Sequence, residues 1–223
     1  MNMKVMFIWL LLSFYQKSYS QYNPKKFKEG YVIHSEDTAK CKIFTGSSVN
    51  KYEQVVFKYS DDKFEEPISY YAGSIITGYG IKTDSTFNHF WAFPMLKKAM
   101  FKKKQEVVYG QVEVSGYLKL LEYVEEKYSP GTMKPTGGFY SGSTSAHTSF
   151  YLYKTGGDSA YNIVGEKAFI LSGIDEEVLI NYFSDCNEIV SKIKAKIKVR
   201  LSDVIEYVKE YNIWYEETQK KKQ

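Results

Sequence analysis

SGIDEEVLINYFSDCNEIVSKIKAKIKVRLSDVIEYVKEYNIWY, residues 172–215, carries the strongest periodic pattern in this chain. Its apolar residues recur at three- and four-residue spacing, which is typical of amphipathic helices. Ser172 and Asp175 form an S-x-x-D pattern close to a capping box, and Asp185 and Ser202 offer two further helix starts. The stretch therefore predicts two or three short helices, and helices this short need packing against another part of the chain.

Each expected helix has one apolar face, and the lysines of the middle helix fall mostly off that face. The tail after the last helix, residues 216–223, is polar and lysine-rich and is predicted to be disordered. The positions expected to be buried are Val178, Leu179, Tyr182 and Phe183 in the first helix, Ile189, Val190, Ile193 and Ile197 in the second, and Val204, Ile205, Val208, Tyr211 and Tyr215 in the third.

Residues 21–171 are predicted to be an antiparallel β-rich region, because apolar and polar residues alternate in short runs separated by turn residues. Residues 95–104 are compatible with a short helix or a loop, and residues 129–149, rich in Gly, Ser, Thr and Pro, are expected to form a flexible loop. Strands followed by helices predict an α+β fold: an antiparallel β-sheet or partly open β-roll with two or three C-terminal helices packed on it. The expected strands are residues 30–34, 38–44, 54–59, 67–71, 74–82, 86–93 (ended by Pro94), 106–114, 116–123, 150–153 and 161–164, with a last short strand at 167–171.

Residues 1–20 have the three parts of a secretory signal peptide. Lys4 gives a positive start, residues 5–14 are apolar, and Ser18 and Ser20 are small residues at the −3 and −1 positions before Gln21. A membrane anchor is the alternative, but the apolar run is about half of the roughly 20 residues that a spanning helix needs. The sequence therefore predicts export, with no transmembrane segment after the signal is removed.

The charge balance argues against a nucleic-acid-binding protein. The chain has 30 Lys and Arg against 26 Asp and Glu, and two of the bases but none of the acids lie in residues 1–20. The remaining 28 bases against 26 acids give a net charge of +2, without the basic excess typical of nucleic-acid binding. One basic cluster could contact an anionic surface, but a solvated segment that protects strands from aggregation is favoured. The cluster is Lys97, Lys98, Lys102, Lys103 and Lys104.

Two cysteines, Cys41 and Cys186, occur in a chain expected to be exported, where a disulfide can form. Cys41 alternates with Ala39 and Ile43 and is expected to point inward from a strand. Cys186 falls in the first turn of an expected helix, where a thiol can be acidified. Two buried free thiols are the commoner outcome and are favoured over a bridge.

No catalytic set is recognisable. The three histidines, His34, His89 and His147, lack metal-ligand spacing, and the segment 141–147 around His147 lacks G-x-S-x-G. His89 lies in an aromatic strand and is expected to be a core or cross-strand partner. A hydrolase whose site gathers His89, Asp84 and Ser85 from separate positions is the enzymatic alternative. Catalytic residues therefore stay unknown, and neither a cofactor nor a metal is predicted.

Two further patterns resemble ligand sites only superficially. Gly78-Tyr79-Gly80 lacks the third glycine and the following helix of a phosphate-binding loop. Acidic residues at 61–62 and 65–66 could bind calcium, but the EF-hand spacing is missing, so a solvated turn is favoured.

Aromatic residues make up 17% of the chain, and 21 residues are tyrosines. Tyrosine-rich surfaces can stack on sugars or line a partner groove, although tyrosine is also a good strand former. The sequence therefore favours a non-enzymatic binding or interaction module whose partner is an envelope protein or a small ligand. A hydrolase and a structural envelope component are the alternatives, and the oligomeric state stays open.

The two ends of the chain resemble a family of uncharacterised exported proteins of gram-negative bacteria. Gly30-Tyr31-Val32-Ile33 with Asp37-Thr38 resembles its GY…DT opening, and the segment 181–186, NYFSDC, with Tyr211-Asn212 resembles its YF-D-C…YN ending. The chain departs from this pattern at Glu36 and Asn187. The resemblance implies export to the periplasm or the extracellular space, with outer-membrane association as a further option, and it implies the architecture but no activity.

Overall fold

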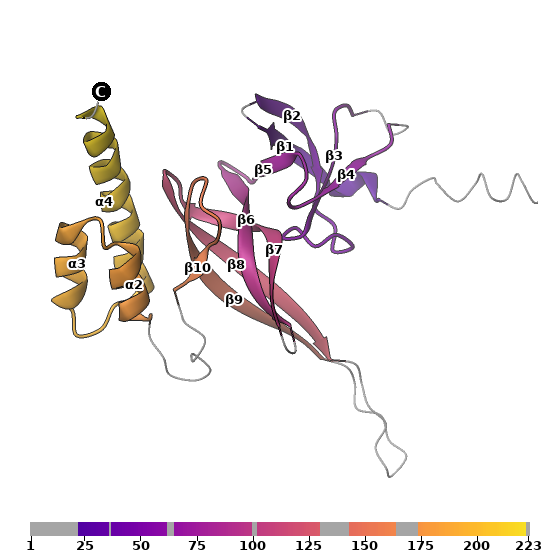
Figure 1. Ribbon diagram of the computed structural model, residues 1–223. Coiled ribbons are helices and arrows are strands. Elements are labelled where there is room, and N and C mark those ends of the chain that lie inside the picture. The colour runs from indigo at the N-terminus through magenta and orange to yellow at the C-terminus, as the bar shows by residue number, and fades with distance from the viewer. Residues whose placement is uncertain are drawn as a thin grey trace, which may run out of the picture.

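The predicted α+β fold is confirmed by a computed structural model of the chain (Figure 1). The structure describes residues 22–35, 37–61, 65–99, 102–129, 143–163 and 174–221. Over these residues the chain forms one ten-stranded antiparallel sheet in the order β10-β9-β8-β7-β6-β5-β1-β2-β3-β4, followed by three helices. The predicted signal peptide, the helix-starting Ser172 and the expected strand at 167–171 lie outside the described residues.

Strands that follow each other in the sequence are mostly adjacent in the sheet, so most connections are hairpins. The exception is β1, which lies between β5 and β2. A short 3-10 turn, η2 (Pro24–Lys26), precedes the sheet. The strands are β1 (Phe27–His34), β2 (Asp37–Phe44), β3 (Gln54–Lys58), β4 (Ile68–Tyr71), β5 (Ile76–Lys82), β6 (Phe87–Ala99), β7 (Lys102–Val114), β8 (Leu118–Ser129), β9 (Ser143–Lys154) and β10 (Tyr161–Asn162), and the helices are α2 (Glu176–Tyr182), α3 (Asn187–Lys194) and α4 (Leu201–Lys220).

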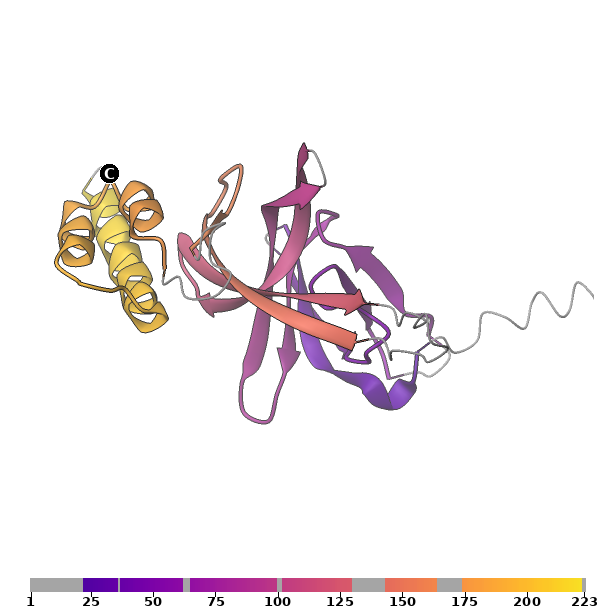
Figure 2. The same cartoon turned by 90° about the horizontal axis from the view of Figure 1, so that it is seen from below.

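The sheet serves two hydrophobic cores. An aromatic core lies within the curved sheet, where the rings of Tyr79 and Phe90 stack with centroids 4.6 Å apart and Tyr109 meets Tyr79 edge-on. A second core lies between the three helices and the β7–β10 part of the sheet. Figures 1 and 2 show the helices at that end of the sheet and β1–β4 at the other end. Most tyrosines of the sheet interior are therefore core residues rather than a binding surface.

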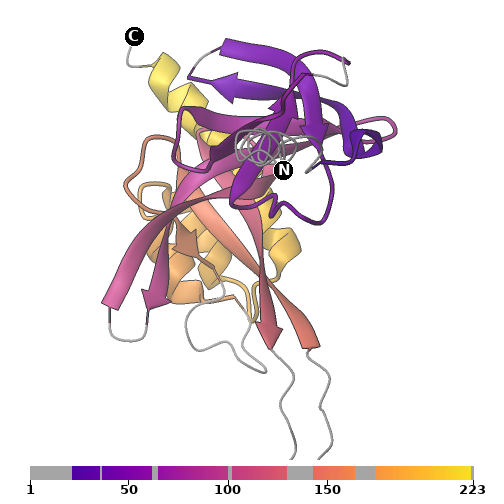
Figure 3. The same ribbon diagram turned by 90° about the vertical axis from the view of Figure 1, so that its right-hand side faces the viewer.

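The loop between β2 and β3 closes the aromatic core. β7 pairs with β8 from Gln111 onward, and ahead of that pairing the backbone N–H of Tyr109 donates to the Tyr52 carbonyl oxygen at 2.6 Å. The Tyr52 ring contacts Tyr123 and Phe90 edge-on. This hydrogen bond pairs the Tyr109 N–H, which lies ahead of the β7–β8 pairing. Figure 3 shows the β8–β9 pair continuing away from the rest of the sheet.

The helices dock through both apolar and polar contacts. The rings of Tyr117 and Tyr215 stack with centroids 3.7 Å apart. The Tyr211 hydroxyl donates to Asp185 Oδ2 at 2.6 Å, and Lys154 of β9 lies 3.3 Å from the same oxygen. The predicted packing of C-terminal helices on an antiparallel sheet is thus confirmed.

Several predicted boundaries are corrected. The described residues of the segment 95–104 are strand, because β6 continues past Pro94 to Ala99 and β7 begins at Lys102. In the segment 129–149, where a loop was expected, Ser129 ends β8 and residues 143–149 belong to β9, which pairs with β8 along its whole length. The expected tail is helical as far as Lys220, where α4 ends.

Helix starts are corrected as well. The S-x-x-D pattern predicted a helix start at Ser172, but Asp175 itself caps α2, accepting from the N–H groups of Glu177 and Val178. Asp185 does not cap α3, because its carboxylate is taken by Tyr211 and Lys154. The third helix begins at Leu201 rather than after Ser202, with the Asp203 carboxylate accepting from the Arg200 N–H at 2.9 Å.

Both cysteines are free and buried, in different cores. Burial raises the pKa of Cys41 to about 12, and burial first, with nearby Glu122, raises the pKa of Tyr52 to about 12. The ordinary values are 9.0 and 10.0, so both groups lose protons more easily in the unfolded chain. Their contribution to stability is therefore complete below about pH 9 and is lost as pH rises towards 12.

The free energy of unfolding is expected to fall between pH 9 and 11, by up to about 1.4 kcal/mol per pH unit for each such group. Urea unfolding at half-unit pH steps measures this slope. A Cys41→Ala variant is the control, because it lacks the thiol. Its free energy of unfolding should therefore not begin to fall near pH 9, and should fall only at the higher pH where tyrosines ionise in the unfolded chain. A free energy that stays flat from pH 8 to 11 would contradict the assignment.

Candidate functional site

Three aromatic side chains, with a fourth beside them at the edge of the aromatic core, lie on β1 and β6, the two strands that flank β5. Tyr31 comes from β1, and Phe87, His89 and Trp91 come from alternate positions of β6. Their neighbours in sequence, such as Val32 and Phe90, point into the core and are buried. Because side chains alternate between faces along a strand, Tyr31, Phe87 and His89 point away from these buried neighbours, whereas Trp91 packs against the aromatic core. We call this group the aromatic platform.

Two glycines of β5 make room for these rings. Gly80 lies opposite Tyr31 of β1 and His89 of β6, and Gly78 lies opposite Trp91. A Cβ atom on Gly80 would lie 2.3 Å from Cε1 and 2.4 Å from Cζ of Tyr31, so the tyrosine ring lies directly over this strand. Its hydroxyl reaches across β5 to Nδ1 of His89.

The rings of Tyr31, Phe87 and His89 contact one another in a patch that is open to solvent. The centroid of Tyr31 lies 5.6 Å from that of Phe87 and 5.8 Å from that of His89. The Phe87 side chain is 40% exposed, His89 is exposed, and Tyr31 and Trp91 are half-buried. Exposed large apolar side chains that touch one another mark interaction sites more often than isolated ones do.

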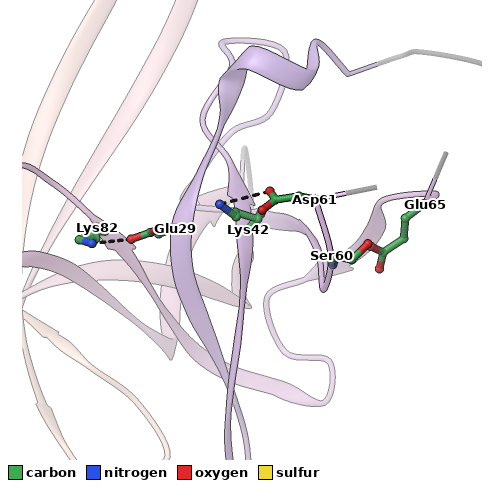
Figure 4. Close-up of polar contacts among 6 residues, drawn as sticks. All are labelled: Glu29, Lys42, Ser60, Asp61, Glu65 and Lys82. Atoms are coloured by element: carbon green, nitrogen blue, oxygen red, sulfur yellow. Dashed lines mark hydrogen bonds and ion pairs between the residues drawn. The ribbon is translucent and has the colours of Figure 1, made fainter. Parts of the chain in front are cut away.

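Two ion pairs lie on and beside β1 (Figure 4). Glu29, two residues before Tyr31 on the same face of β1, pairs with Lys82 of β5, and Lys42 of β2 lies 3.2 Å from Asp61. The hydrogen bond and the charge of Lys82 lower the pKa of Glu29. Charges of both signs are therefore present near the rings. Water can compete with the partners of these solvent-accessible ion pairs.

Trp91 links the platform to a buried lysine. Lys119 Nζ lies 4.5 Å from the Trp91 ring centroid and donates to the Gly116 carbonyl at 3.0 Å and to Thr155 Oγ1 at 2.6 Å. Among the described residues no carboxylate pairs with it, and burial lowers its pKa. The negative face of the indole ring stabilises the ammonium group in place of an acid, which holds Trp91 in position.

The histidine predictions have separate outcomes. His89 is a cross-strand partner, as expected, through its contact with Tyr31. Asp84 and Ser85 lie exposed in the turn between β5 and β6, and the described part of the chain places no hydrogen bond between either of them and His89. His34 ends β1 and His147 lies exposed on β9. The hydrolase alternative stays a prediction.

The acidic turn is occupied by internal contacts. Glu65 accepts hydrogen bonds from the N–H groups of Tyr59 and Ser60 at 2.9 and 2.7 Å and from the Ser60 hydroxyl, and these bonds lower its pKa. Asp61 pairs with Lys42, and Asp62 lies outside the described residues (Figure 4). Across the described ranges no group of three His, Cys, Asp or Glu side chains is arranged to hold a metal ion.

The basic cluster sits at the far end of the β6–β7 hairpin, where Lys97 lies opposite Lys104 and Lys98 opposite Lys103. Lys104 is exposed and lies 3.4 Å from Glu106. Like charges facing each other across a hairpin disfavour further strand pairing.

The sequence contained the platform's residues without identifying the platform. His89 was expected in an aromatic strand, but the sequence did not show which face of that strand is exposed. The two glycines of β5 were compared only with a phosphate-binding loop. Their alternation, Gly78-x-Gly80, was the available signal, because two glycines on one face of a strand leave room for neighbouring rings.

No protein-family model, curated protein sequence or solved structure matches this chain. The exported-protein family that its two ends resemble therefore stays a prediction. None of the helices in the described segments combines the length and the hydropathy that crossing a bilayer requires.

Proposed function

We propose that the protein is an exported, non-enzymatic binding module of the gram-negative envelope, and that the aromatic platform binds a saccharide. Export is inferred from the sequence of residues 1–20. The binding role rests on one observation, the half-buried ring of Tyr31 and the exposed ring of Phe87 held beside each other across the glycines of β5.

A saccharide suits this surface because it offers both an apolar ring face and hydroxyl groups. The apolar face of a sugar stacks on an aromatic ring. Its hydroxyls need hydrogen-bonding groups at the edge, which Glu29 and Lys82 supply. A wholly apolar partner would remove water from this ion pair without offering it new hydrogen bonds, which costs free energy.

His89 completes the donor set. Burial raises the pKa of Tyr31, so its hydroxyl stays protonated at neutral pH and can donate to His89 Nδ1. The Nε2 atom of the imidazole, on the other side of the ring from Nδ1, can then hydrogen-bond to a ligand hydroxyl. Protein contacts thus orient the ring in the absence of ligand, which lowers the entropy cost of binding.

Saccharide binding is expected to quench or shift the fluorescence of Trp91. After removal of residues 1–20, the tryptophans are Trp91 and Trp214, so a Trp214→Phe background isolates the platform. Titration with soluble polysaccharides and peptidoglycan fragments measures affinity. Phe87→Ala is expected to weaken binding about tenfold, since aromatic contacts of this kind contribute about 0.5–1.5 kcal/mol beyond burial.

Tyr71→Ala is the matched control. Tyr71 lies on β4 and is 66% exposed, away from β5 and β6 in the sheet. Its removal should leave binding unchanged. Absence of binding across the panel, or equal losses in the Phe87→Ala and Tyr71→Ala variants, would rule out the platform as a saccharide site.

A further inference from the structure

A second candidate site lies far from the platform, where α3 ends and α4 begins. A pocket of about 630 Å³ opens there, which we call the α3–α4 pocket. Four cationic side chains line it, together with Tyr207 and the exposed Ile197. They are Lys192, Lys196, Lys198 and Arg200.

Tyr207 is the observation that points to a ligand. Its side chain lines the pocket and is 4% exposed. Its hydroxyl is fully buried and has no hydrogen-bond partner among the described residues. Buried hydroxyl groups are nearly always paired, because an unpaired one costs stability. Burial also raises the pKa of Tyr207, so the group is a proton donor at neutral pH.

The cations around this hydroxyl are of two kinds. Lys192 is paired with Glu188 at 3.1 Å and Glu210 at 2.9 Å, and Lys196 is paired with Asp203 at 2.6 Å. These two lysines are therefore largely neutralised.

Lys198 and Arg200 have no ion pair within the described part of the chain. Arg200 is also the residue that precedes the first turn of α4, a 20-residue helix whose N-terminal end attracts negative charge. The uncompensated charge of the pocket is thus positive and lies beside an unused hydroxyl donor.

We propose that the α3–α4 pocket binds a phosphate group, with the Tyr207 hydroxyl and the Arg200 guanidinium as its hydrogen-bond donors and Lys198 as a further positive charge. Phosphate presents several strong acceptor oxygens, and arginine matches their geometry with two parallel bonds. This assignment is independent of the platform, which lies on other elements of the fold.

Ile197 indicates where such a phosphate could come from. The sequence placed Ile197 on the buried face of the middle helix, but that helix, α3, ends at Lys194, and the Ile197 side chain is fully exposed. It protrudes between Lys196 and Lys198 at the pocket. An apolar side chain flanked by cations suits contact with an anionic lipid layer, so the phosphate is either that of a phospholipid headgroup or a free phosphate.

The test uses the chain without residues 1–20 at low ionic strength. One arm titrates inorganic phosphate and follows binding calorimetrically. The other sediments the protein with phosphatidylcholine vesicles containing about 30% phosphatidylglycerol, against pure phosphatidylcholine vesicles. Binding in either arm supports the proposal, and the arm that responds identifies the source. Binding in neither arm overturns it.

The Tyr207→Phe variant removes only the hydroxyl and is expected to weaken binding about tenfold. Ile197→Ser is expected to weaken vesicle binding and leave phosphate binding unchanged. Lys220→Gln, at the other end of α4, is the charge control and should bind as the parent does.

Thermal unfolding without ligand gives a second readout. Since the Tyr207 hydroxyl has no partner, the Tyr207→Phe variant should be as stable as the parent protein or more stable. A variant that binds as tightly as the parent, or that unfolds several degrees lower, would overturn the proposal, because the hydroxyl would then serve the fold.

Discussion

Removing everything after Leu171 is expected to leave an insoluble protein. The helices cover four sheet residues and the residue that follows β10, each at most 7% exposed. Burying an aliphatic side chain of this size contributes about 1.5–3 kcal/mol, so uncovering five of them costs on the order of 10 kcal/mol. That equals the whole stability of a typical domain. The five are Val114, Leu118, Leu120, Leu152 and Ile163.

The size of the effect is measured by the soluble fraction after expression and by thermal unfolding of any soluble protein. Truncation after Glu216 is the control, because it keeps Tyr215 stacked on Tyr117 and removes mainly exposed or half-exposed polar residues. This shorter deletion should leave a soluble protein with a cooperative transition. A protein ending at Leu171 that also unfolds cooperatively would show that the sheet does not need the helices.

The sequence predicted those strands and helices whose burial is one-sided. Ala39, Cys41 and Ile43 alternate with polar residues because one face of β2 covers the core, and the same logic holds for Ile189 and Ile193 in α3. Apolar and polar residues alternate because only one face of the element is buried. The pattern can therefore be recognised in the sequence wherever a single face is buried.

The same reasoning explains why residues 143–148 were not predicted to form a strand. β9 begins with Ser143, and its residues 143–148 are all exposed, so no hydrophobic period marks them. They form a strand because β8 lies beside them, with Tyr128 opposite Thr144 and Glu125 opposite His147. Strand identity here depends on a long-range partner, and a local pattern cannot contain that information.

The candidate sites were missed for a related reason. Tyr31 and His89 are 58 residues apart and meet only because β1 inserts between β5 and β2. Asp185 has the composition of a helix cap, but Tyr211 competes for its carboxylate from 26 residues away. In both places the side-chain chemistry was visible in the sequence, whereas the partner followed from strand order and helix docking.

Asn212→Ala is expected to lower the free energy of unfolding by about 2–4 kcal/mol. Asn212 of α4 is 9% exposed and binds the turn between β7 and β8. Its Oδ1 accepts from the Leu118 N–H at 2.8 Å, and its Nδ2 donates to the carbonyls of Leu118 at 2.9 Å and Ser115 at 3.2 Å. Alanine would leave the Leu118 N–H and carbonyl buried without these partners, which costs more than the bonds contribute.

Urea unfolding of Asn212→Ala against Ile213→Ala separates this effect from a loss of helix packing. Ile213 is the next residue of α4 and is 60% exposed, so its truncation should change stability by less than about 0.5 kcal/mol. Equal losses in the two variants would mean that Asn212 does not join the helices to the sheet.

Gly116 gives a further check on the same joint. It adopts φ +146°, and a Cβ atom there would lie 2.3 Å from Asn212 Nδ2. Gly116→Ala should therefore destabilise the protein both by backbone strain and by displacing the Asn212 amide. In the Asn212→Ala background the second cost disappears, so the two losses should sum to more than the loss in the double variant. Strict additivity would contradict a direct contact between this turn and α4, because residues that share an interaction are coupled.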